Sequence, residues 1–359
     1  SPDRIESLCA ISDRCGGCPL IRLGASAQRA LKLGRLKRAI AGLGMPALEP
    51  TFDETESAFG YRRRARFGFR KVGRGIVLGY FAHGSHRLID VERCPVISPQ
   101  LDRALAQLRE ALSPWLTGSG EIELFELAND AVSASVHCDV IAPPELYRAA
   151  EALAAQTPFV HVSVRVEDGA PARFGRALSH ADGLDGASLR TPVEGFAQIN
   201  AAMNARLGRY VSELAEARAA RVIELYAGHG NFSVLLARDA AAFCAVEGDA
   251  ASAAACRDNL RERGLRDARV IASDVATARL PDRADVIVLD PPRAGAVDLG
   301  RIAERTHAAR VVYVSCHMTT LQRDLRALHA VGYRVDRAVA LDMFPQTAHV
   351  EAVVRLRRA

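Results

Sequence analysis

Cys316 is the side chain whose sequence surroundings most strongly favour chemistry. It follows an apolar run at 311–314 and Ser315, and a pattern of helical spacing begins near Thr319 or Thr320. Open α/β sheets bind their ligands at the carboxyl ends of the strands, so a thiol between a strand and a helix stands where a nucleophile is useful. The alternative is a buried thiol without a catalytic role, because free cysteines often pack as small apolar side chains.

Two acidic residues end segments that can meet the same rim. Asp290 follows the apolar run at 286–289 and precedes Pro-Pro-Arg293. Glu351 ends the segment 343–351, which reads Met-Phe-Pro-Gln-Thr-Ala-His-Val-Glu. A nucleophile, an acid and a base on one rim predict covalent catalysis on a small planar substrate. With these neighbours, the catalytic interpretation of the thiol is favoured over the packing one.

Four of the eight cysteines show a spacing typical of a metal centre. Three form a Cys-x5-Cys-x2-Cys triplet around two glycines, and the fourth is remote. These candidate ligands are Cys9, Cys15, Cys18 and Cys94. A triplet with a remote fourth member favours an iron–sulfur cluster, whereas a four-cysteine zinc site usually pairs two short-spaced doublets. The spacing is not the Cys-x3-Cys-x2-Cys of radical enzymes. The remaining thiols, at 138, 244 and 256, are predicted core or bystander residues.

A glycine turn at 226–230, Tyr-Ala-Gly-His-Gly, separates a strand-like run from Asn231-Phe-Ser233. Glycines let the backbone approach a ligand, and Asn231 or Ser233 is expected to cap the next helix. Glu247 ends the following strand-like segment, where an acid binds ribose hydroxyls, and Asp274 ends the one after it. For Glu247 the alternative is a solvated acid at a strand end. A dinucleotide would favour a third glycine, and no phosphate-binding lysine follows the turn, so S-adenosylmethionine is the favoured ligand.

Cations and aromatic rings are interleaved in the segment 61–71. The arginines predicted to contact RNA there are Arg62, Arg63, Arg64 and Arg66. Guanidinium groups suit phosphate, and aromatic rings suit unstacked bases. The alternative is a strand with one charged, solvated face. The formal net charge of +5 permits an anionic partner without demanding one.

The length of 359 residues favours two domains. Residues 1–190 are predicted to form an α+β domain that starts with the cysteine loop. It includes a basic helix at 25–43 that can pack on the second domain, and a loop marked by Pro46 and Pro50. From 191 to 359, strands alternate with helices, which predicts a parallel, doubly wound α/β sheet. No apolar run approaches the ~20 residues of a membrane helix.

In this order, the motifs resemble those of the RNA 5-methyluridine methyltransferases that carry an iron–sulfur cluster. The resemblance runs along nearly the whole chain, through the cysteine triplet, Tyr-Arg-Arg-Arg-Ala-Arg at 61–66, Phe-Ala-Gln-Ile-Asn at 196–200, Asp-Pro-Pro-Arg-Ala-Gly at 290–295 and Phe-Pro-Gln-Thr-Ala-His-Val-Glu at 344–351. It implies a Rossmann-like methyltransferase domain with S-adenosylmethionine as methyl donor. It also implies a [4Fe–4S] cluster held by the four candidate cysteines.

The resemblance implies roles for individual residues. Cys316 would be the nucleophile and Glu351 the base, while Arg293 would contact RNA. The S-adenosylmethionine pocket would be lined by Gln198, Tyr226, Gly228, Asn231, Glu247, Asp274 and Asp290. Asp290 is assigned to catalysis as well, because its carboxyl suits either the uracil ring or the orientation of the sulfonium.

The implied reaction is 5-methylation of a uridine. The thiolate of Cys316 adds to C6, C5 takes the methyl group, Glu351 removes the C5 proton, and the thiolate leaves. The chain departs from the family at His317-Met318, where Asn-Pro is usual, and this alters the turn beside the nucleophile. Some members carry an oligonucleotide-binding barrel ahead of the cysteines; because the cysteine loop starts at Cys9, we expect that barrel to be absent or to have been trimmed from the given sequence.

The expected partner is ribosomal or transfer RNA with an unstacked uridine in a loop. We expect no DNA or membrane partner, and a monomer acting in the cytoplasm. One rival function is an RNA cytosine-5-methyltransferase, whose usual Pro-Cys motif is missing. An amino-group methyltransferase would have an aromatic ring where Arg293 stands. A non-catalytic RNA-binding or folding factor that retains the cofactor fold is supported by the altered turn after Cys316, and a redox sensor built on the cluster is a further alternative.

Overall fold

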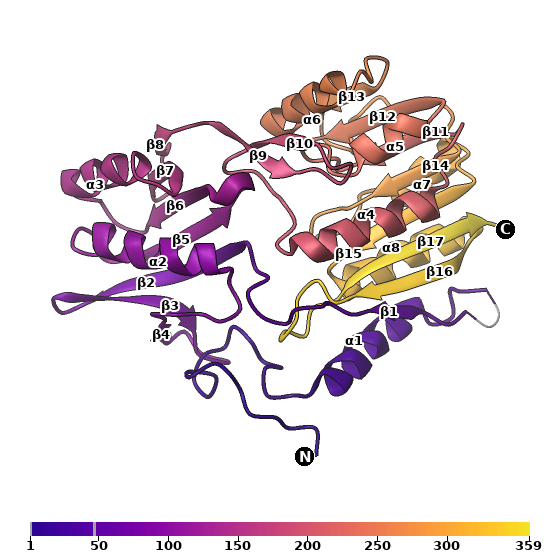
Figure 1. Ribbon diagram of the computed structural model, residues 1–359. Coiled ribbons are helices and arrows are strands. Elements are labelled where there is room, and N and C mark those ends of the chain that lie inside the picture. The colour runs from indigo at the N-terminus through magenta and orange to yellow at the C-terminus, as the bar shows by residue number, and fades with distance from the viewer. Residues whose placement is uncertain (1, 46–47) are drawn as a thin grey trace. The chain divides into compact units, whose positions relative to one another are not determined.

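The computed structural model describes residues 2–45 and 48–359, and the chain divides into two compact units (Figure 1). The first unit is Ser1–Gly24, Ser57–His180 and Ala197–Asn200; the second is Ala25–Glu56, Ala181–Phe196 and Ala201–Ala359. A single boundary between residues 190 and 191 does not describe this division, because residues 25–56 belong to the second unit.

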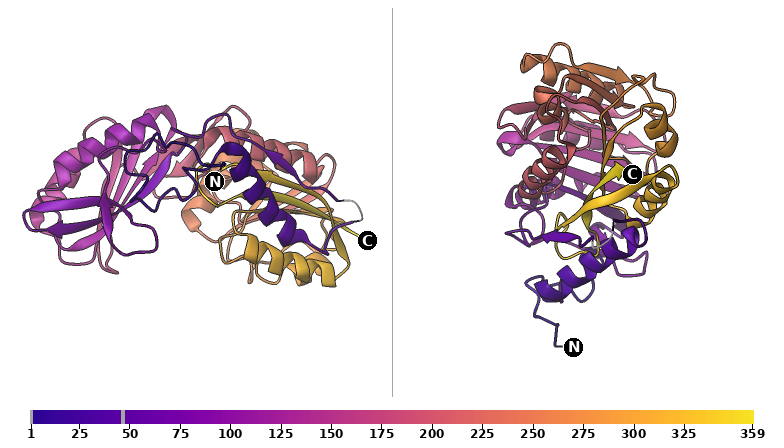
Figure 2. Two further views of the ribbon diagram at one scale, coloured as in Figure 1. Left: turned by 90° about the horizontal axis from the view of Figure 1, so that it is seen from below. Right: turned by 90° about the vertical axis from the view of Figure 1, so that its right-hand side faces the viewer.

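The first unit contains a seven-stranded sheet. In spatial order its strands are β4 (Leu88–Asp90), β3 (Gly75–Phe81), β2 (Arg64–Val72), β5 (Ser119–Glu126), β6 (Val132–Cys138), β7 (Phe159–Val166) and β8 (Ala172–Gly175). Neighbouring strands are antiparallel except β6 and β7, which are parallel. The helices α2 (Pro99–Leu112) and α3 (Pro144–Ala154) lie on one face of this sheet (Figure 2) and contact each other. A short 3-10 helix, η1 (Ala128–Asp130), joins β5 to β6.

Helix α2 shows how the sequence builds this layer. Its leucines recur at helical spacing and are fully buried against the sheet, while the Ser98 hydroxyl caps its first turn by accepting from Leu101 N at 3.1 Å. The sheet contributes the inward face of β2 to the same core, where Ala65, Phe67 and Phe69 alternate with more exposed residues. Period-two burial in the strand and helical spacing in α2 therefore produce one core.

The second unit contains an eight-stranded sheet with helices on both faces. In spatial order the strands are β1 (Thr51–Asp53), β16 (Tyr333–Leu341), β17 (Glu351–Arg358), β15 (Arg310–Ser315), β14 (Val286–Leu289), β11 (Arg221–Leu225), β12 (Ala242–Glu247) and β13 (Arg269–Ala272). Strand β17 is antiparallel to both of its neighbours, and the other pairs are parallel. The doubly wound α/β fold expected from the alternating pattern is thereby confirmed.

Two separate cores lie on the two faces of this sheet. One contains residues of α1 (Ala25–Ile40), α7 (Leu299–Arg305) and α8 (Met318–Ala330), together with Ile223 and Ile287. The other contains residues of α4 (Ala201–Ala215), α5 (Ser233–Asp239) and α6 (Ala250–Glu262), together with Val222 and Val286. Successive residues of one buried strand thus point to opposite cores, as expected for a parallel sheet covered on both sides.

Three short segments depart from the sequence expectation. Residues 51–53 follow the prolines of a predicted loop, yet they form the edge strand β1, which pairs with β16. Of those prolines, Pro46 lies outside the described residues. Strands β9 (Leu178–Asp182) and β10 (Ser188–Pro192) form a separate two-stranded sheet. Three- to five-residue strands carry too little periodicity to be predicted. Across the described residues, no helix combines the length and the apolar character needed to cross a membrane.

Candidate active site

The candidate catalytic residues meet because of how the strands of the second unit run. Parallel β14 and β15 end at Leu289 and Ser315, so the residues that follow them emerge at the same edge. Strand β17 runs the other way beside β15, with Ala352 opposite Ser315, so its first residue lies at that edge too. The topology therefore brings together Asp290, Cys316 and Glu351. Sequence reasoning proposed this group, and the reversed β17 is what completes it.

The Cys316 thiol is held in its neutral form. Burial, together with the nearby carboxyl groups of Glu351 and Asp290, raises its pKa to about 11. Arg293 acts in the opposite direction, through its charge and a hydrogen bond between the two side chains. The sequence assigned Arg293 to RNA, and the structure places it beside the nucleophile. A neutral resting thiol needs to lose its proton before or during attack.

Glu351 is 2% exposed and lies close to a second acid. Burial raises the pKa of its carboxyl well above the ordinary value, and the charge of Asp290 raises it further. The buried Glu224 on β11 belongs to the same acidic region. Burial raises its pKa to about 8, although a hydrogen bond from Ser233 Oγ at 2.6 Å opposes that shift. Displaced pKa values concentrated at one rim are typical of a functional site.

The loop after β14 is fixed by a buried acid that sequence reasoning missed. Asp324 on α8 accepts hydrogen bonds from Tyr313 Oη at 2.6 Å and from Ala296 N at 2.7 Å. Gly295 has a φ of +86°, and a Cβ there would lie 2.6 Å from an Asp324 carboxylate oxygen, so only glycine fits. These contacts hold the segment that carries Asp290 and Arg293 against α8. The signal in the sequence is an aspartate in α8, between Leu321 and Leu325, and it does not reveal these partners.

The altered turn after the nucleophile retains a helix cap. His317 is the N-cap of α8, and its Nδ1 accepts from Thr320 N at 3.4 Å. Its own N–H donates to Ser315 Oγ at 3.1 Å. The imidazole thus takes the place that an asparagine side chain can occupy at a cap. The helix that follows Cys316 therefore starts with a side-chain cap in spite of the departure from the family motif.

The glycine turn has the geometry of a ligand-binding loop. Tyr226, Gly228 and Gly230 have φ values of +61°, +57° and +96°. Glu247 accepts from Gly228 N at 2.8 Å and from Asp249 N at 2.7 Å, so its carboxylate is oriented at the turn. This is the edge at the topological switch point, since β12 and β14 lie on opposite sides of β11. Ligands of open α/β sheets bind there.

The residues around this turn differ in detail from the sequence expectation. Asn231 exchanges hydrogen bonds with Asn204 of α4 at 2.9 and 3.1 Å. The predicted helix cap by Asn231 or Ser233 is wrong, because the N-cap is Phe232 without a side-chain bond and Ser233 instead donates to Glu224. Asp274 accepts from Ala276 N at 2.8 Å. Its role, and that of Gln198 in the first unit, stay predictions.

The four candidate metal ligands line one cavity of the first unit. Its lining includes Cys9, Cys15, Cys18 and Cys94. Burial, together with the neighbouring thiols of Cys94 and Cys15, raises the pKa of Cys18 to about 12, so the sulfurs are near one another. Among the described residues, no three His, Cys, Asp or Glu side chains are close enough to share a single metal ion. The sulfurs instead surround a space.

Arg62 also lines that cavity. Its Nε is buried and has no hydrogen-bond partner in the described part of the chain. Its charge lowers the pKa of Cys18, against the effect of burial. A buried donor without a partner is costly, so this nitrogen fits a site that takes an anionic group. Sequence reasoning placed Arg62 in the RNA set because its neighbours in the chain are basic.

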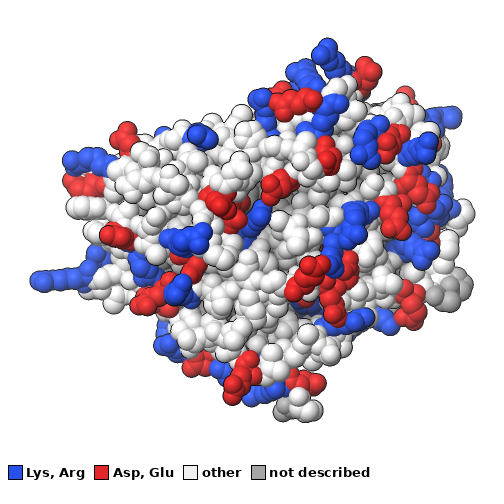
Figure 3. Space-filling view, in the orientation of Figure 1, with Lys and Arg blue, Asp and Glu red and all other residues white. Residues whose placement is uncertain are grey.

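The other arginines of that set are paired with acids of β5. Arg64 bonds to Glu123, and Arg66 contacts Glu123 at 3.3 Å and Glu121 at 3.5 Å. Arg63 lies 3.4 Å from Glu126. On the face shown in Figure 3, basic and acidic groups are similarly interspersed. These pairs are consistent with the alternative to RNA binding, a strand with one charged, solvated face. The assignment of these arginines to RNA stays a prediction.

The fold is that of a methyltransferase with a Rossmann-like sheet. A solved structure of the same fold is that of Pyrococcus abyssi tRNA (uracil-54, C5)-methyltransferase in complex with S-adenosyl-L-homocysteine, with a TM-score of 0.73, 24% identity and coverage of 99% of this chain and 86% of that one. The family model for tRNA (uracil-5-)-methyltransferase matches residues 186–359.

Relatives with similar sequences identify the family within the methyltransferases. The chain is 37% identical to the 23S rRNA (uracil(1939)-C(5))-methyltransferase RlmD of Chromohalobacter salexigens over 377 aligned residues, covering 100% of this chain and 77% of that protein. It is 34% identical to RlmD of Pseudomonas putida, covering 98% and 80%. The chain belongs to the RNA uracil-C5 methyltransferase family. The predicted methyl donor, S-adenosylmethionine, and the predicted enzyme class are those of this family.

Proposed function

We propose that this protein methylates C5 of a uridine in large-subunit ribosomal RNA, at the site named for its RlmD relatives. The observation that carries the proposal is the convergence of Cys316, Asp290 and Glu351 beside the glycine turn of the same sheet. The relatives named for 23S rRNA cover nearly the whole chain, which favours ribosomal over transfer RNA.

The chemistry begins at a thiol that is neutral at rest. Cys316 loses its proton to solvent, and its sulfur forms a bond to C6 of the uracil while the C5–C6 double bond becomes an enolate. The C5 carbon then attacks the methyl carbon of S-adenosylmethionine, and the carbon–sulfur bond of the sulfonium breaks to give the neutral thioether. Both steps need the base out of its stack and held at the rim.

The second half of the reaction restores the ring. The Glu351 carboxylate takes the proton of C5, the electron pair reforms the C5–C6 double bond, and the bond from C6 to Cys316 sulfur breaks. The positive sulfonium favours ionised carboxyls nearby, so we expect methyl-donor binding to lower the pKa values of Glu351 and Asp290. Arg293 stabilises the thiolate both when it forms and when it leaves.

The methyl donor would lie at the glycine turn. Glu247 would accept from the ribose hydroxyls, because its carboxylate is already oriented by two backbone N–H groups. Gly228 and Tyr226 would approach the amino-acid part, with Asn231 and Asp274 completing the part of the pocket that the second unit supplies; the role of Gln198, in the first unit, rests on the family resemblance. Asp290 directly follows the last residue of β14. Its carboxyl would orient either the uracil ring or the sulfonium.

An iron–sulfur cluster would occupy the cysteine cavity. Four thiolates around a space suit a [4Fe–4S] cluster, because each binds a different iron; around one zinc ion at ~2.3 Å the sulfurs would converge more closely. Arg62 supports this assignment, because a cluster with four thiolates is anionic and its sulfur atoms can accept from the buried Nε. In this role the cluster braces the loop that precedes the first unit's sheet.

RNA contact is assigned to the remaining arginines of the segment 61–71. Arg63, Arg64 and Arg66 lie within or just before β2 and keep their acidic partners close, so phosphate contact needs an exchange of partners. Arg66 has the most accessible side chain of the three, at 62% exposure. We expect it to contribute most to salt-dependent RNA affinity.

The test is trapping with 5-fluorouridine-substituted ribosomal RNA and S-adenosylmethionine, followed by mass spectrometry. Fluorine cannot leave as a proton, so the methylated adduct should persist on Cys316. The same protein with Cys316→Ala should bind RNA and the methyl donor without forming an adduct. If wild-type protein with an intact cysteine site binds the methyl donor yet forms no adduct, the proposed function is wrong.

A further inference from the structure

The loop between β16 and β17 leads directly into the proposed base. It spans residues 342–350 and ends where β17 begins at Glu351. Within it, Gln346 and Thr347 are each 5% exposed, and Gln346 has a φ of +66°. A non-glycine residue in the left-handed region is held there by its surroundings. The position of Glu351 therefore depends on what fixes this loop.

Helix α1 supplies a buried cation to the loop. Lys32 has no exposed surface, forms an ion pair with Asp342, and donates to the Phe344 carbonyl at 3.0 Å. Burial lowers the pKa of its ammonium group, whereas Asp342 raises it. Lysine is almost never fully buried unless it is paired. Both of its partners lie in the first three residues of the loop, so Lys32 anchors the loop's start.

One turn earlier, α1 supplies an amide that pairs with the strained residue. Gln28 Nε2 donates to Gln346 Oε1 at 2.9 Å, and Gln346 N donates to Gln28 Oε1 at 3.1 Å. Both side chains are buried. This reciprocal pair selects one backbone conformation at Gln346. Arg35 adds a third contact from the same helix, donating to the Ala348 carbonyl at 2.7 Å.

We propose that Lys32 and Gln28 are positioning residues for the methyl-transfer reaction: through the loop 342–350 they hold Glu351 at the distance needed to take the C5 proton. The proposal rests on the proposed role of Glu351. In this proposal α1 supports the second half of the reaction, which follows formation of the bond between Cys316 and C6 and transfer of the methyl group to C5.

The consequence is a specific block in the reaction sequence. If Glu351 is displaced, attack by Cys316 and methyl transfer continue, but the C5 proton leaves slowly. The methylated covalent adduct should then accumulate on RNA that contains ordinary uridine. A displacement of about 1 Å can reduce a rate by about 100-fold. Replacing a residue that only stabilised the fold would lower the melting temperature without changing the ratio of covalent adduct to released product.

The experiment compares Lys32→Met with Lys37→Met in the full chain. Lys37 lies on the same helix but is exposed and paired with Glu49, so its replacement is the matched control. For Lys32→Met we expect kcat to fall about 100-fold, KM for RNA to stay the same, and the methylated adduct to accumulate on ordinary uridine. Rates are normalised to folded protein measured by near-ultraviolet circular dichroism. Lys37→Met should behave as wild type.

A second variant covers the case in which Lys32→Met does not fold. Gln28→Ala keeps the ion pair of Lys32 with Asp342 and removes the contact with Gln346, so we expect the same adduct accumulation with a smaller loss of kcat. The proposal is wrong if both folded variants release product as wild type does, or lose activity without accumulating adduct. Trapping of the wild-type protein by 5-fluorouridine RNA tests the proposed function separately, so the two failures are distinguishable.

Discussion

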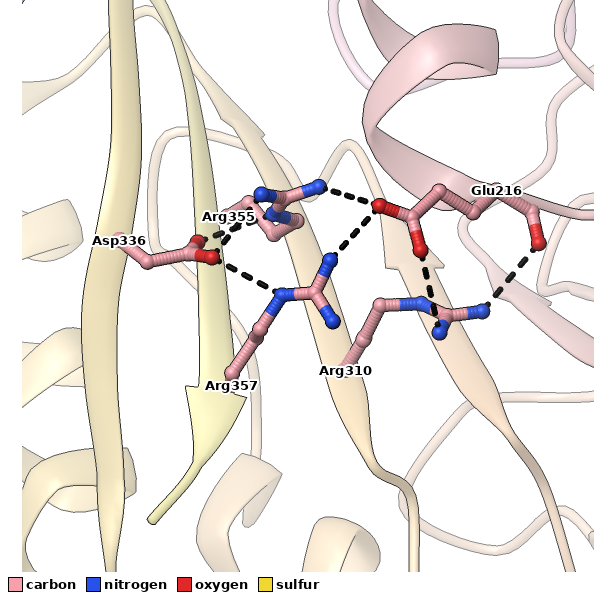
Figure 4. A network of polar contacts seen from close by, with 5 residues as sticks. All are labelled: Glu216, Arg310, Asp336, Arg355 and Arg357. Carbon is pink, nitrogen blue, oxygen red and sulfur yellow. Dashed lines mark hydrogen bonds and ion pairs between the residues drawn. The ribbon is translucent and has the colours of Figure 1, made fainter.

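Charged side chains are paired differently at the two ends of strands β15 and β17. Figure 4 shows the end away from the nucleophile, where two acids bind three arginines. Glu216 contacts Arg310 at 3.3 Å, and Arg355 and Arg357 at 2.7 Å each. Asp336 contacts Arg355 and Arg357 at 2.9 Å each. Every carboxylate in this network has cations in direct contact.

At the other end of the same strands, acids face acids. Asp290 raises the pKa values of Glu351 and Glu224, and both acids near Cys316 raise the pKa of its thiol. Arg293 is the cation whose charge reaches the thiol. Acids that lie close together have displaced pKa values that suit proton exchange, whereas acids in direct contact with arginines keep their charge. The contrast separates the part of the sheet that does chemistry from the part that holds it together.

Of the substitutions that test this contrast, Cys316→Ala is expected to have the largest effect on activity. We expect methylation to fall below detection, because no other group at the rim can add to C6 and be expelled again. The measurement is transfer of labelled methyl groups to ribosomal RNA. Cys244→Ala is the control, since it removes a buried thiol from β12 of the same sheet. Turnover by Cys316→Ala would contradict the covalent mechanism.

Replacing Glu351 with Gln tests the acid without changing its shape. We expect kcat to fall by about 10²- to 10⁴-fold, the usual contribution of a general base, with the methylated adduct accumulating on ordinary uridine. Because burial and Asp290 both disfavour the charged carboxylate, the variant should be at least as stable as wild type at neutral pH. A destabilised variant would mean that Glu351 has a structural partner instead.

The sequence was enough to predict the strands and helices of the second unit, because their apolar periodicity is strong. It also indicated that Asp290 and Cys316 reach one rim, since strand ends in a parallel sheet share an edge. It could not predict Asp324, Lys32 or Gln28, whose importance arises from contacts between segments far apart in the chain. Nor could it assign Arg293 and Arg62 beside sulfur atoms, because an arginine's partner is set by tertiary packing.

The pH dependence of activity follows from the nucleophile. Its pKa of about 11 lies above neutral pH, so the thiolate fraction rises with pH up to that value. We expect kcat/KM for RNA to rise as pH increases from neutral towards alkaline conditions. Arg293→Gln removes the side chain that lowers this pKa, and should shift the rising limb to higher pH. An unchanged profile in Arg293→Gln would show that Arg293 does not act on the thiol.

The pH dependence of stability tests the buried acid Glu224. Its pKa is raised from 4.5 to about 8, so the folded state binds more protons than the unfolded state between these values. Stability should therefore decrease as pH rises through that interval. Glu224→Gln should flatten this decrease, as measured by urea denaturation at several pH values. Glu213→Gln, on the surface of α4, is the control and should leave the slope unchanged.

The smallest effect is expected at the paired end. Arg355→Met removes a side chain that is 10% exposed and contacts both acids, but Arg357 still contacts Asp336 and Glu216. Breaking a buried pair costs 3–5 kcal/mol when the partner is left alone, so with Arg357 in place we expect a loss of about 2 kcal/mol in the free energy of unfolding. The activity of the folded enzyme should not change, because the network lies at the opposite end of β15 from Cys316. A change in kcat without a change in stability would mean that the two ends of the sheet are coupled, and that compensated charge in this protein also serves catalysis.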